Sequence, residues 1–208
     1  VLNVADVIEL LPVADEHAHD DEAEEHTADD GHDHGDLDPH FWQDPTRMST
    51  LVQELSTRLA DADPENEADY TGRAAATATL LADLDAELSS GFQECARREF
   101  ITTHAAFHYL ARRYDLTEIG ISGVNPDADP SPARIAEIHE EAEAHGITTI
   151  FFETLTSDAV AASIAGDLGL PTAVLDPLEG VTDQSPGTDY PSIMRANLSA
   201  LSAANDCS

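Results

Sequence analysis

The sequence predicts an α/β fold, with a parallel sheet and crossover helices in the carboxyl-terminal part of the chain. After Gly91, short apolar runs alternate with helical patterns of about ten to fifteen residues, and a long Ala-rich helical stretch precedes that point. The composition agrees, because 41% of the residues are apolar and provide a core, although only 5% are aromatic. The 208 residues suffice for one domain or one and a half.

Two helices are expected before the sheet. Residues 1–14 suit a short strand or turn. A first helix runs from Thr46 to the interruption at Pro64, and a second, Ala-rich helix covers about 65–90. The apolar residues of the first recur at helical spacing: Met48, Leu51, Val52, Leu55 and Leu59.

Strands and helices alternate in the rest of the chain. The expected strands are residues 100–102, 116–121, 148–152 and 172–175. The expected helices are residues 105–113, 132–145 with Ser131 as N-cap, 157–168 and 190–204. In a parallel sheet of this kind, ligands bind at the carboxyl ends of the strands.

Three candidate ligands follow strand ends. His104, Glu153 and Asp176 each come directly after a predicted strand, and His40 lies in an ordered Asp-Pro-rich turn. Imidazole and carboxylate together suit a divalent transition metal such as Zn, Mn or Fe. Each residue also has an ordinary structural interpretation: His40 and Asp176 as turn residues, and His104 as a helix cap. The pattern leaves both interpretations open.

The charge excludes several classes of partner. Nine basic residues, all of them Arg, stand against 42 acidic ones, which gives a formal net charge of −33. Nucleic-acid binding is not expected, because phosphate contacts require clustered bases, and anionic lipid surfaces would repel the chain. No apolar run of about 18 residues is present, so no membrane insertion is expected. The acidity indicates a protein adapted to high salt, which screens this self-repulsion.

Residues 15–38 differ from the rest of the chain. They contain twelve Asp or Glu, five His and no base, a composition that is typical of a mobile loop. The clustered imidazoles favour weak metal collection, and the alternative is a salt-adapted loop in which His is incidental. The five residues are His17, His19, His26, His32 and His34. The two cysteines, Cys95 and Cys207, are either one disulfide or two buried thiols.

Three motifs resemble those of a known family. Residues 38–45, Asp-Pro-His-Phe-Trp-Gln-Asp-Pro, are similar to the DPHxWxDP signature of the solute-binding proteins of zinc and manganese ABC importers. Residues 103–110 resemble the second signature, HDAFxYL after a strand, with Ala105 where Asp is usual. Residues 175–178 resemble the late DPL motif, and an acidic His-rich loop before the first signature is typical of the zinc branch.

The resemblance implies a metal site. His40, His104 and Asp176 would be the metal ligands, and Glu153 would line the cleft behind them. The metal would be Zn²⁺, with Mn²⁺ as the alternative, because manganese binders usually carry Glu at the position of His104. The five histidines of residues 15–38 would form an auxiliary metal loop.

The resemblance also implies a function and a division of the chain. The protein would not be an enzyme but would capture Zn²⁺ at the extracellular face of the cell membrane and deliver it to an ABC transporter permease. Residues 1–45 would be a remnant of the amino-terminal lobe, 46–90 the connecting helices and 91–208 the carboxyl-terminal α/β lobe. The rest of the amino-terminal lobe and a signal or lipobox anchor are expected ahead of Val1.

Two other functions remain open from the residues alone. A zinc-dependent hydrolase would use Glu153 as general base beside a metal-bound water. A metal-buffering protein would hold several ions weakly rather than one tightly.

Overall fold

The computed structural model describes residues 1–13, 37–126, 128–155 and 157–208. Most of the acidic segment 15–38, including its five histidines, therefore lies outside the described residues, and so does the prediction that it is an auxiliary metal loop. The amino-terminal segment forms a short 3₁₀ helix, Val4–Asp6, and an isolated bridge joins Pro12 to Leu37.

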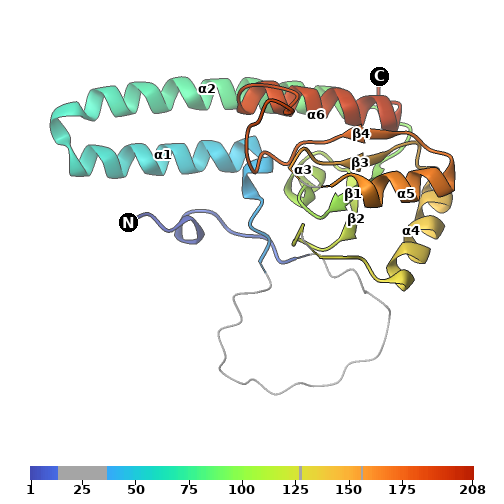
Figure 1. Ribbon diagram of the computed structural model, residues 1–208. Helices are drawn as coiled ribbons and strands as arrows, with labels where there is room; N and C mark the ends of the chain where they lie inside the picture. The colour runs from blue at the N-terminus through green and yellow to red at the C-terminus, as the bar shows by residue number, and fades with distance from the viewer. Residues whose placement is uncertain (14–36, 127, 156) are drawn as a thin grey trace, which may run out of the picture.

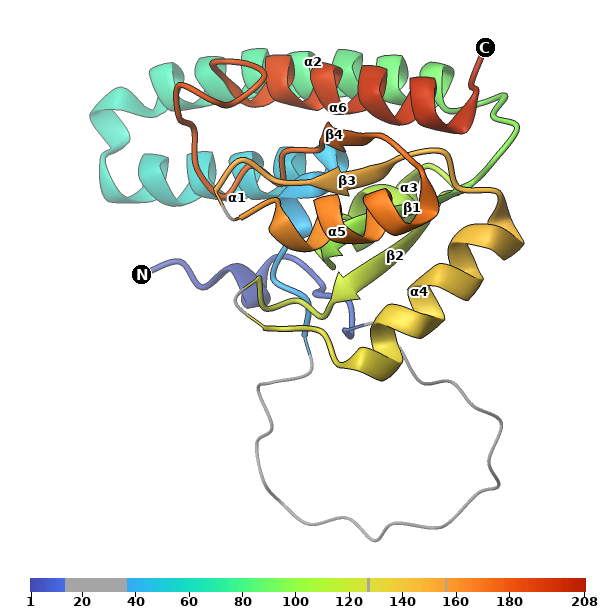
Figure 2. The same cartoon turned by 45° about the vertical axis from the view of Figure 1, so that its right-hand side comes forward.

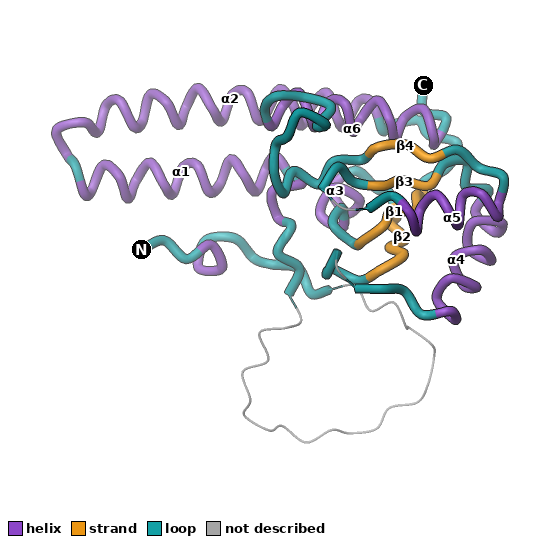
Figure 3. Tube along the Cα trace, in the orientation of Figure 1, coloured by secondary structure: helices purple, strands orange, loops and turns teal. Residues whose placement is uncertain are grey.

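The two predicted helices before the sheet form a hairpin. α1 (Pro45–Ala62) and α2 (Glu67–Gly91) are joined by a 3₁₀ turn at Pro64–Asn66 and extend away from the sheet (Figure 3). Asp44 caps α1 by accepting a hydrogen bond from the Thr46 N–H. Only the last turns of α2 are buried, through Leu81, Leu84 and Leu88, so α2 is anchored by its carboxyl-terminal part.

The predicted parallel sheet is confirmed and has four strands in the described part of the chain. They are β1 (Glu99–His104), β2 (Thr117–Ser122), β3 (Ile150–Phe152) and β4 (Thr172–Val174). Their order is β2-β1-β3-β4 and every pairing is parallel. All carboxyl ends therefore meet at one edge of the sheet, where the candidate ligands were predicted (Figure 1).

Helices cover both faces of the sheet (Figure 2). Neighbouring residues of a strand point to opposite faces, and Phe100 and Ile101 show this. Phe100 belongs to a core cluster with side chains of α2, α3 and α6, whereas Ile101 belongs to one with side chains of α4 and α5. The helices after the hairpin are α3 (His108–Arg113), α4 (Pro132–His145), α5 (Ala159–Leu168) and α6 (Tyr190–Asn205).

One helix begins later than the sequence predicts. The helix expected from residue 105 starts at His108. The Glu118 carboxylate accepts hydrogen bonds from the Ala106 N–H at 3.1 Å and the Phe107 N–H at 2.9 Å, which holds residues 105–107 in a turn. A tertiary contact from β2 therefore overrides the local helical pattern.

The two cysteines form a disulfide. Cys95 lies just before β1 and Cys207 just after α6, and the bridge closes a loop with a sequence separation of 112. The disulfide links the segment before β1 to the segment after α6. Among the described residues, no helix is both long and apolar enough to cross a membrane.

Candidate metal centre

His40 is held by a buried carboxylate. It immediately precedes the 3₁₀ turn Phe41–Gln43 and is 2% exposed. Its Nδ1 lies 2.7 Å from Asp38 Oδ1, and its backbone N–H donates to the same oxygen at 2.9 Å. Tyr109 Oη donates to the Asp38 carbonyl at 2.8 Å. The backbone and the ring of His40 are thus oriented together, with Nε2 left to face the sheet edge.

His104 is held in the same way from the other side. It is the last residue of β1, and Glu153 follows the last residue of β3, the neighbouring strand. His104 Nδ1 lies 2.7 Å from Glu153 Oε1, and both side chains are buried. A carboxylate bound to Nδ1 sets the tautomer and leaves Nε2 as the free ligand atom. His104 Nε2 is itself buried and makes no hydrogen bond within the described part of the chain.

Both imidazoles converge on Glu179. The Oε1 atom of Glu179 lies 3.1 Å from His40 Nε2 and 3.5 Å from His104 Nε2. These three residues offer ligand atoms within 4.8 Å of one another, and no other group of His, Cys, Asp and Glu does so among the described residues. Two imidazole nitrogens and a carboxylate oxygen are a ligand set that suits Zn²⁺. The arrangement can hold one divalent cation.

Burial, hydrogen bonds and neighbouring charges shift the pKa values of two groups around this cluster. Burial raises the pKa of Asp38, but the contacts of its carboxylate with His108 and His40 outweigh it and hold that pKa at about 2. Burial lowers the pKa of His104, but the hydrogen bond and charge of Glu153, together with the charge of Glu179, raise it above the ordinary value. Asp38 therefore stays ionised behind His40, while His104 keeps a proton more readily than a free imidazole.

The structure brings some of the predicted ligands together and leaves others outside the cluster. His40 and His104 come together, and Glu153 contacts His104 through Nδ1, on the side away from Glu179. Asp176 is buried, but it is not part of the cluster: its Oδ1 accepts the Leu178 N–H at 2.8 Å. Its Oδ2 lies 3.5 Å from Thr154 Oγ1. The ligand role of Asp176 remains a prediction, and in this geometry Glu179 supplies the carboxylate that faces the Nε2 atoms of both histidines.

Sequence reasoning missed Glu179 and Asp38. Glu179 is three residues after Asp176 in the same loop at the carboxyl edge of the sheet, so the strand-end rule located the loop but not the side chain. Asp38 is the first residue of the Asp-Pro-His motif. The sequence feature that could have identified it is its position two residues before a candidate ligand.

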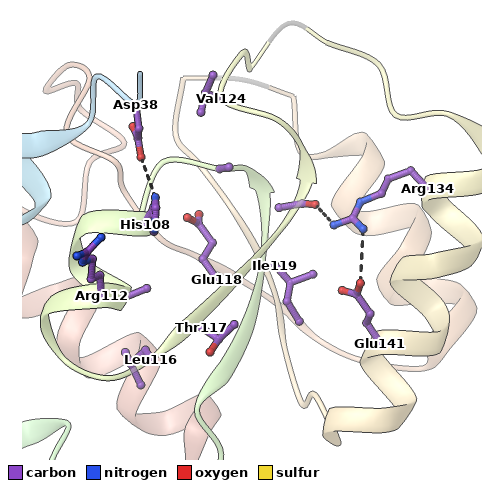
Figure 4. A pocket seen from close by; sticks show the side chains of 13 residues that line it. Asp38, His108, Arg112, Leu116, Thr117, Glu118, Ile119, Val124, Arg134 and Glu141 are labelled. Carbon is purple, nitrogen blue, oxygen red and sulfur yellow. Dashed lines mark hydrogen bonds and ion pairs between the residues drawn. The ribbon is translucent and has the colours of Figure 1, made fainter. Parts of the chain in front are cut away.

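A separate pocket of about 400 Å³ lies between β2, α3 and α4. Figure 4 shows Asp38 and His108 facing each other at its rim, where Asp38 Oδ2 and His108 Nδ1 are 3.6 Å apart, with Glu118 below them. Burial raises the pKa of Glu118 to about 7, against the hydrogen bonds it accepts. This pocket brings no third potential ligand close enough to Asp38 and His108 to make a second metal site in the described chain.

Comparison with known proteins gives a consistent family. The family described as zinc-uptake complex component A, periplasmic, matches residues 1–204. The zinc-binding protein AdcA of Streptococcus pyogenes serotype M3 is 36% identical over 212 residues, which cover 99% of this chain and 41% of that protein. The high-affinity zinc uptake system protein ZnuA of Bacillus subtilis is 35% identical, over 79% of this chain and 52% of its own length. The chain thus spans about half or less of these two relatives.

Solved structures agree with the fold. A Zn(II)-bound mutant variant of AdcAII of Streptococcus pneumoniae superposes with a TM-score of 0.82 at 27% identity, covering 99% of this chain and 70% of that one. The laminin-binding protein Lbp of Streptococcus pyogenes has a TM-score of 0.76 at 32% identity, covering 81% and 66%.

Proposed function

Because the chain belongs to the family of periplasmic zinc-uptake component A, we propose that it is the metal-capturing part of a solute-binding protein of a zinc ABC importer. The observation that carries this proposal is the convergence of His40, His104 and Glu179, whose ligand atoms lie within 4.8 Å of one another. Two buried imidazoles with fixed tautomers are prepared to bind a cation without reorganising, which favours tight capture.

The cation that fits best is Zn²⁺, with Mn²⁺ as the alternative. Two nitrogen ligands and one oxygen ligand suit Zn²⁺, whereas Mn²⁺ sites favour oxygen. Two relatives are named as zinc-binding and zinc-uptake proteins. The ligand set and the relatives therefore support the same ion.

The proposed protein partner is inferred from the family and not from a surface of this chain. We propose delivery of Zn²⁺ to an ABC transporter permease at the extracellular face of the membrane, because one relative is named a lipoprotein and the family is described as periplasmic. Residues 91–208 would form the carboxyl-terminal lobe, 46–90 the connecting helices, and residues 1–45 part of the other lobe. The excess of acidic residues would serve solvation in concentrated salt.

The hydrolase alternative is weaker. It requires Glu153 as a general base beside a metal-bound water, but Glu153 Oε1 is 2.7 Å from His104 Nδ1, on the far side of the ring from Glu179. That carboxylate orients a ligand instead of facing the place where a cation would bind. The named relatives are described as a zinc-binding protein and a zinc uptake system protein.

The test is a Zn²⁺ titration of the whole chain against a chelator of known affinity. We expect one tight Zn²⁺ per chain, and the same site in a variant in which all five histidines of residues 15–38 are replaced by Ala. Several weak sites that vanish in that variant would instead support buffering by the acidic segment. Hydrolytic turnover by the zinc-loaded protein would support the enzyme.

Zinc affinity is expected to fall as the pH drops, beginning above the ordinary imidazole pKa of 6.5. The raised pKa of His104 means that the metal-free fold holds this proton tightly, so Zn²⁺ must displace it. The same proton stabilises the metal-free fold at low pH, and this contribution is lost as the pH rises through the raised pKa. The measurement is the chelator competition repeated between about pH 5.5 and 8.

The control for this pH dependence is Glu153→Gln. Gln keeps an oxygen that can accept from His104 Nδ1 but removes the negative charge that helps to raise the His104 pKa, so the fall in affinity should begin at a lower pH. The comparison uses the pH of onset and not the absolute affinity, since the variant also weakens the contact that orients the ring. An identical onset in both proteins would contradict this account.

A further inference from the structure

The segment that carries His40 is fastened directly to the loop that carries Glu179. Trp42 Nε1 donates a hydrogen bond to the Pro177 carbonyl at 2.7 Å, and Gln43 Nε2 donates to the same oxygen at 2.5 Å. Trp42 and Gln43 follow His40 by two and three residues, and Pro177 precedes Glu179 by two. We call these two hydrogen bonds to one carbonyl the Pro177 latch.

The Pro177 latch is enclosed by further contacts. Gln43 is fully buried, so its amide has little access to solvent when it is not bound to Pro177. Tyr190 Oη donates to the Trp42 carbonyl at 2.8 Å, and the Trp42 indole stands edge-on to the His40 ring, with centroids 5.3 Å apart. Losing a buried hydrogen-bond partner is costly, so the latch holds this geometry strongly.

The chain turns sharply between the latch and Glu179. Leu178 has a φ of +62°, a left-handed conformation that is unfavourable for a side chain with a Cβ. Its N–H is held by Asp176 Oδ1 at 2.8 Å, and the Asp176 backbone exchanges two hydrogen bonds with the Asn197 side chain, at 2.9 and 2.7 Å. Asp176 and Asn197 fix one end of the turn, and the Pro177 latch fixes its middle. A strained residue persists where its surroundings overdetermine it.

Glu179 differs from the two histidines in how it is supported. Each imidazole has a buried carboxylate at Nδ1, whereas the Glu179 side chain is 26% exposed and the contacts of its Oε1 atom are the two Nε2 atoms themselves. Its place over the histidines therefore depends on the backbone of the loop. In the absence of the latch, this loop could move while the histidines stay in place.

We infer that Trp42 and Gln43 are positioning residues that set the affinity of the metal site by holding Glu179 over His40 and His104. This inference rests on the proposed function, because it concerns the same site. It assigns to Trp42 and Gln43 a task distinct from that of the ligand His40. It also gives Asp176 a structural task, which is to hold the turn that presents Glu179.

The experiment is a double-mutant cycle on Zn²⁺ affinity in the whole chain. Gln43→Met keeps the length of the side chain and removes the donor, and we expect a loss of about 10-fold, the lower end for an outer partner of a metal ligand. Glu179→Gln should weaken binding by itself. In the Glu179→Gln background, Gln43→Met should cost nothing further, because the residue it positions has already been replaced.

Two controls separate positioning from general damage. Gln53→Met makes the same substitution on an exposed residue of α1 and should leave Zn²⁺ affinity unchanged. Trp42→Phe removes the other donor while keeping an aromatic ring, and should behave like Gln43→Met. The visible absorption of bound Co²⁺ provides a second readout, since it changes when a ligand is displaced but not when the fold is only less stable.

The outcomes are distinguishable. An equal loss from Gln43→Met in both backgrounds would overturn the inference, because the residue would then act through His40 or the fold. Unchanged affinity in Glu179→Gln would also overturn it, while leaving zinc capture intact. Absence of any tight Zn²⁺ binding by the unmodified chain would instead refute the proposed function.

Discussion

Zn²⁺ affinity is expected to fall by at least about 100-fold in His104→Ala, since even partners one shell further out are worth about 10- to 100-fold. His104 is buried at the end of β1, and its Nε2 is one of the three converging ligand atoms. Alanine removes the ligand atom and leaves Glu153 without its partner. Chelator competition measures the affinity, and thermal unfolding without metal shows whether the fold survives.

The matched control is His145→Ala. His145 is the last residue of α4, lies on the surface and is outside the cluster, so its replacement should leave the affinity unchanged. Equal losses in the two variants would show that the site has been placed wrongly.

The same assay decides between Glu179 and Asp176. Glu179→Gln should weaken binding, whereas Asp176→Asn should have a small effect, because an Asn oxygen can still accept the Leu178 N–H. The reverse result would return the ligand role to Asp176, as the family resemblance predicted.

Loss of the disulfide is expected to reduce the free energy of unfolding by about 4–5 kcal/mol, the amount that loop-closure entropy assigns to a loop of about 100 residues. The bridge between Cys95 and Cys207 has a sequence separation of 112, so it restricts a large part of the unfolded chain. Urea unfolding of the Cys95→Ser/Cys207→Ser variant measures the change. The same variant should keep its Zn²⁺ affinity, because Cys95 lies before β1 and the metal cluster lies at the opposite, carboxyl ends of the strands.

Reduction of the unmodified chain provides the control. Its stability in reductant should equal that of the double Ser variant, because both lack the same covalent link. A change of less than about 1 kcal/mol would mean that the unfolded chain is already restricted by residual structure, which the entropy argument neglects.

Much of the fold could be predicted from local pattern. The helix over residues 132–145 has the predicted bounds and the predicted cap, because Ser131 Oγ accepts the Arg134 N–H. That cap is a contact between near neighbours in the chain, so the sequence contains it. The helix expected from residue 105 begins later, because its start depends on Glu118, which reaches it from another strand.

The candidate site could be predicted only in part. Strand ends and the Asp-Pro-His motif led to His40 and His104, because parallel strands bring such positions to one edge. They did not separate Asp176 from Glu179, three residues apart in one loop. That choice depends on the left-handed turn at Leu178 and on the Pro177 latch. The two hydrogen bonds of the latch join positions separated in sequence by 135 and 134 residues, respectively.

The sequence by itself therefore predicted the class of fold and the edge of the sheet that carries the candidate site, because periodicity is a property of short segments. The resemblance of its motifs to a known family pointed to the two histidines. The tertiary structure alone decided which carboxylate faces those histidines, which carboxylates stand behind them, and that the two cysteines are bonded. The physical reason is that hydrogen bonds and covalent links between distant segments set the direction of a side chain. The local sequence pattern shows only where along the chain that side chain occurs.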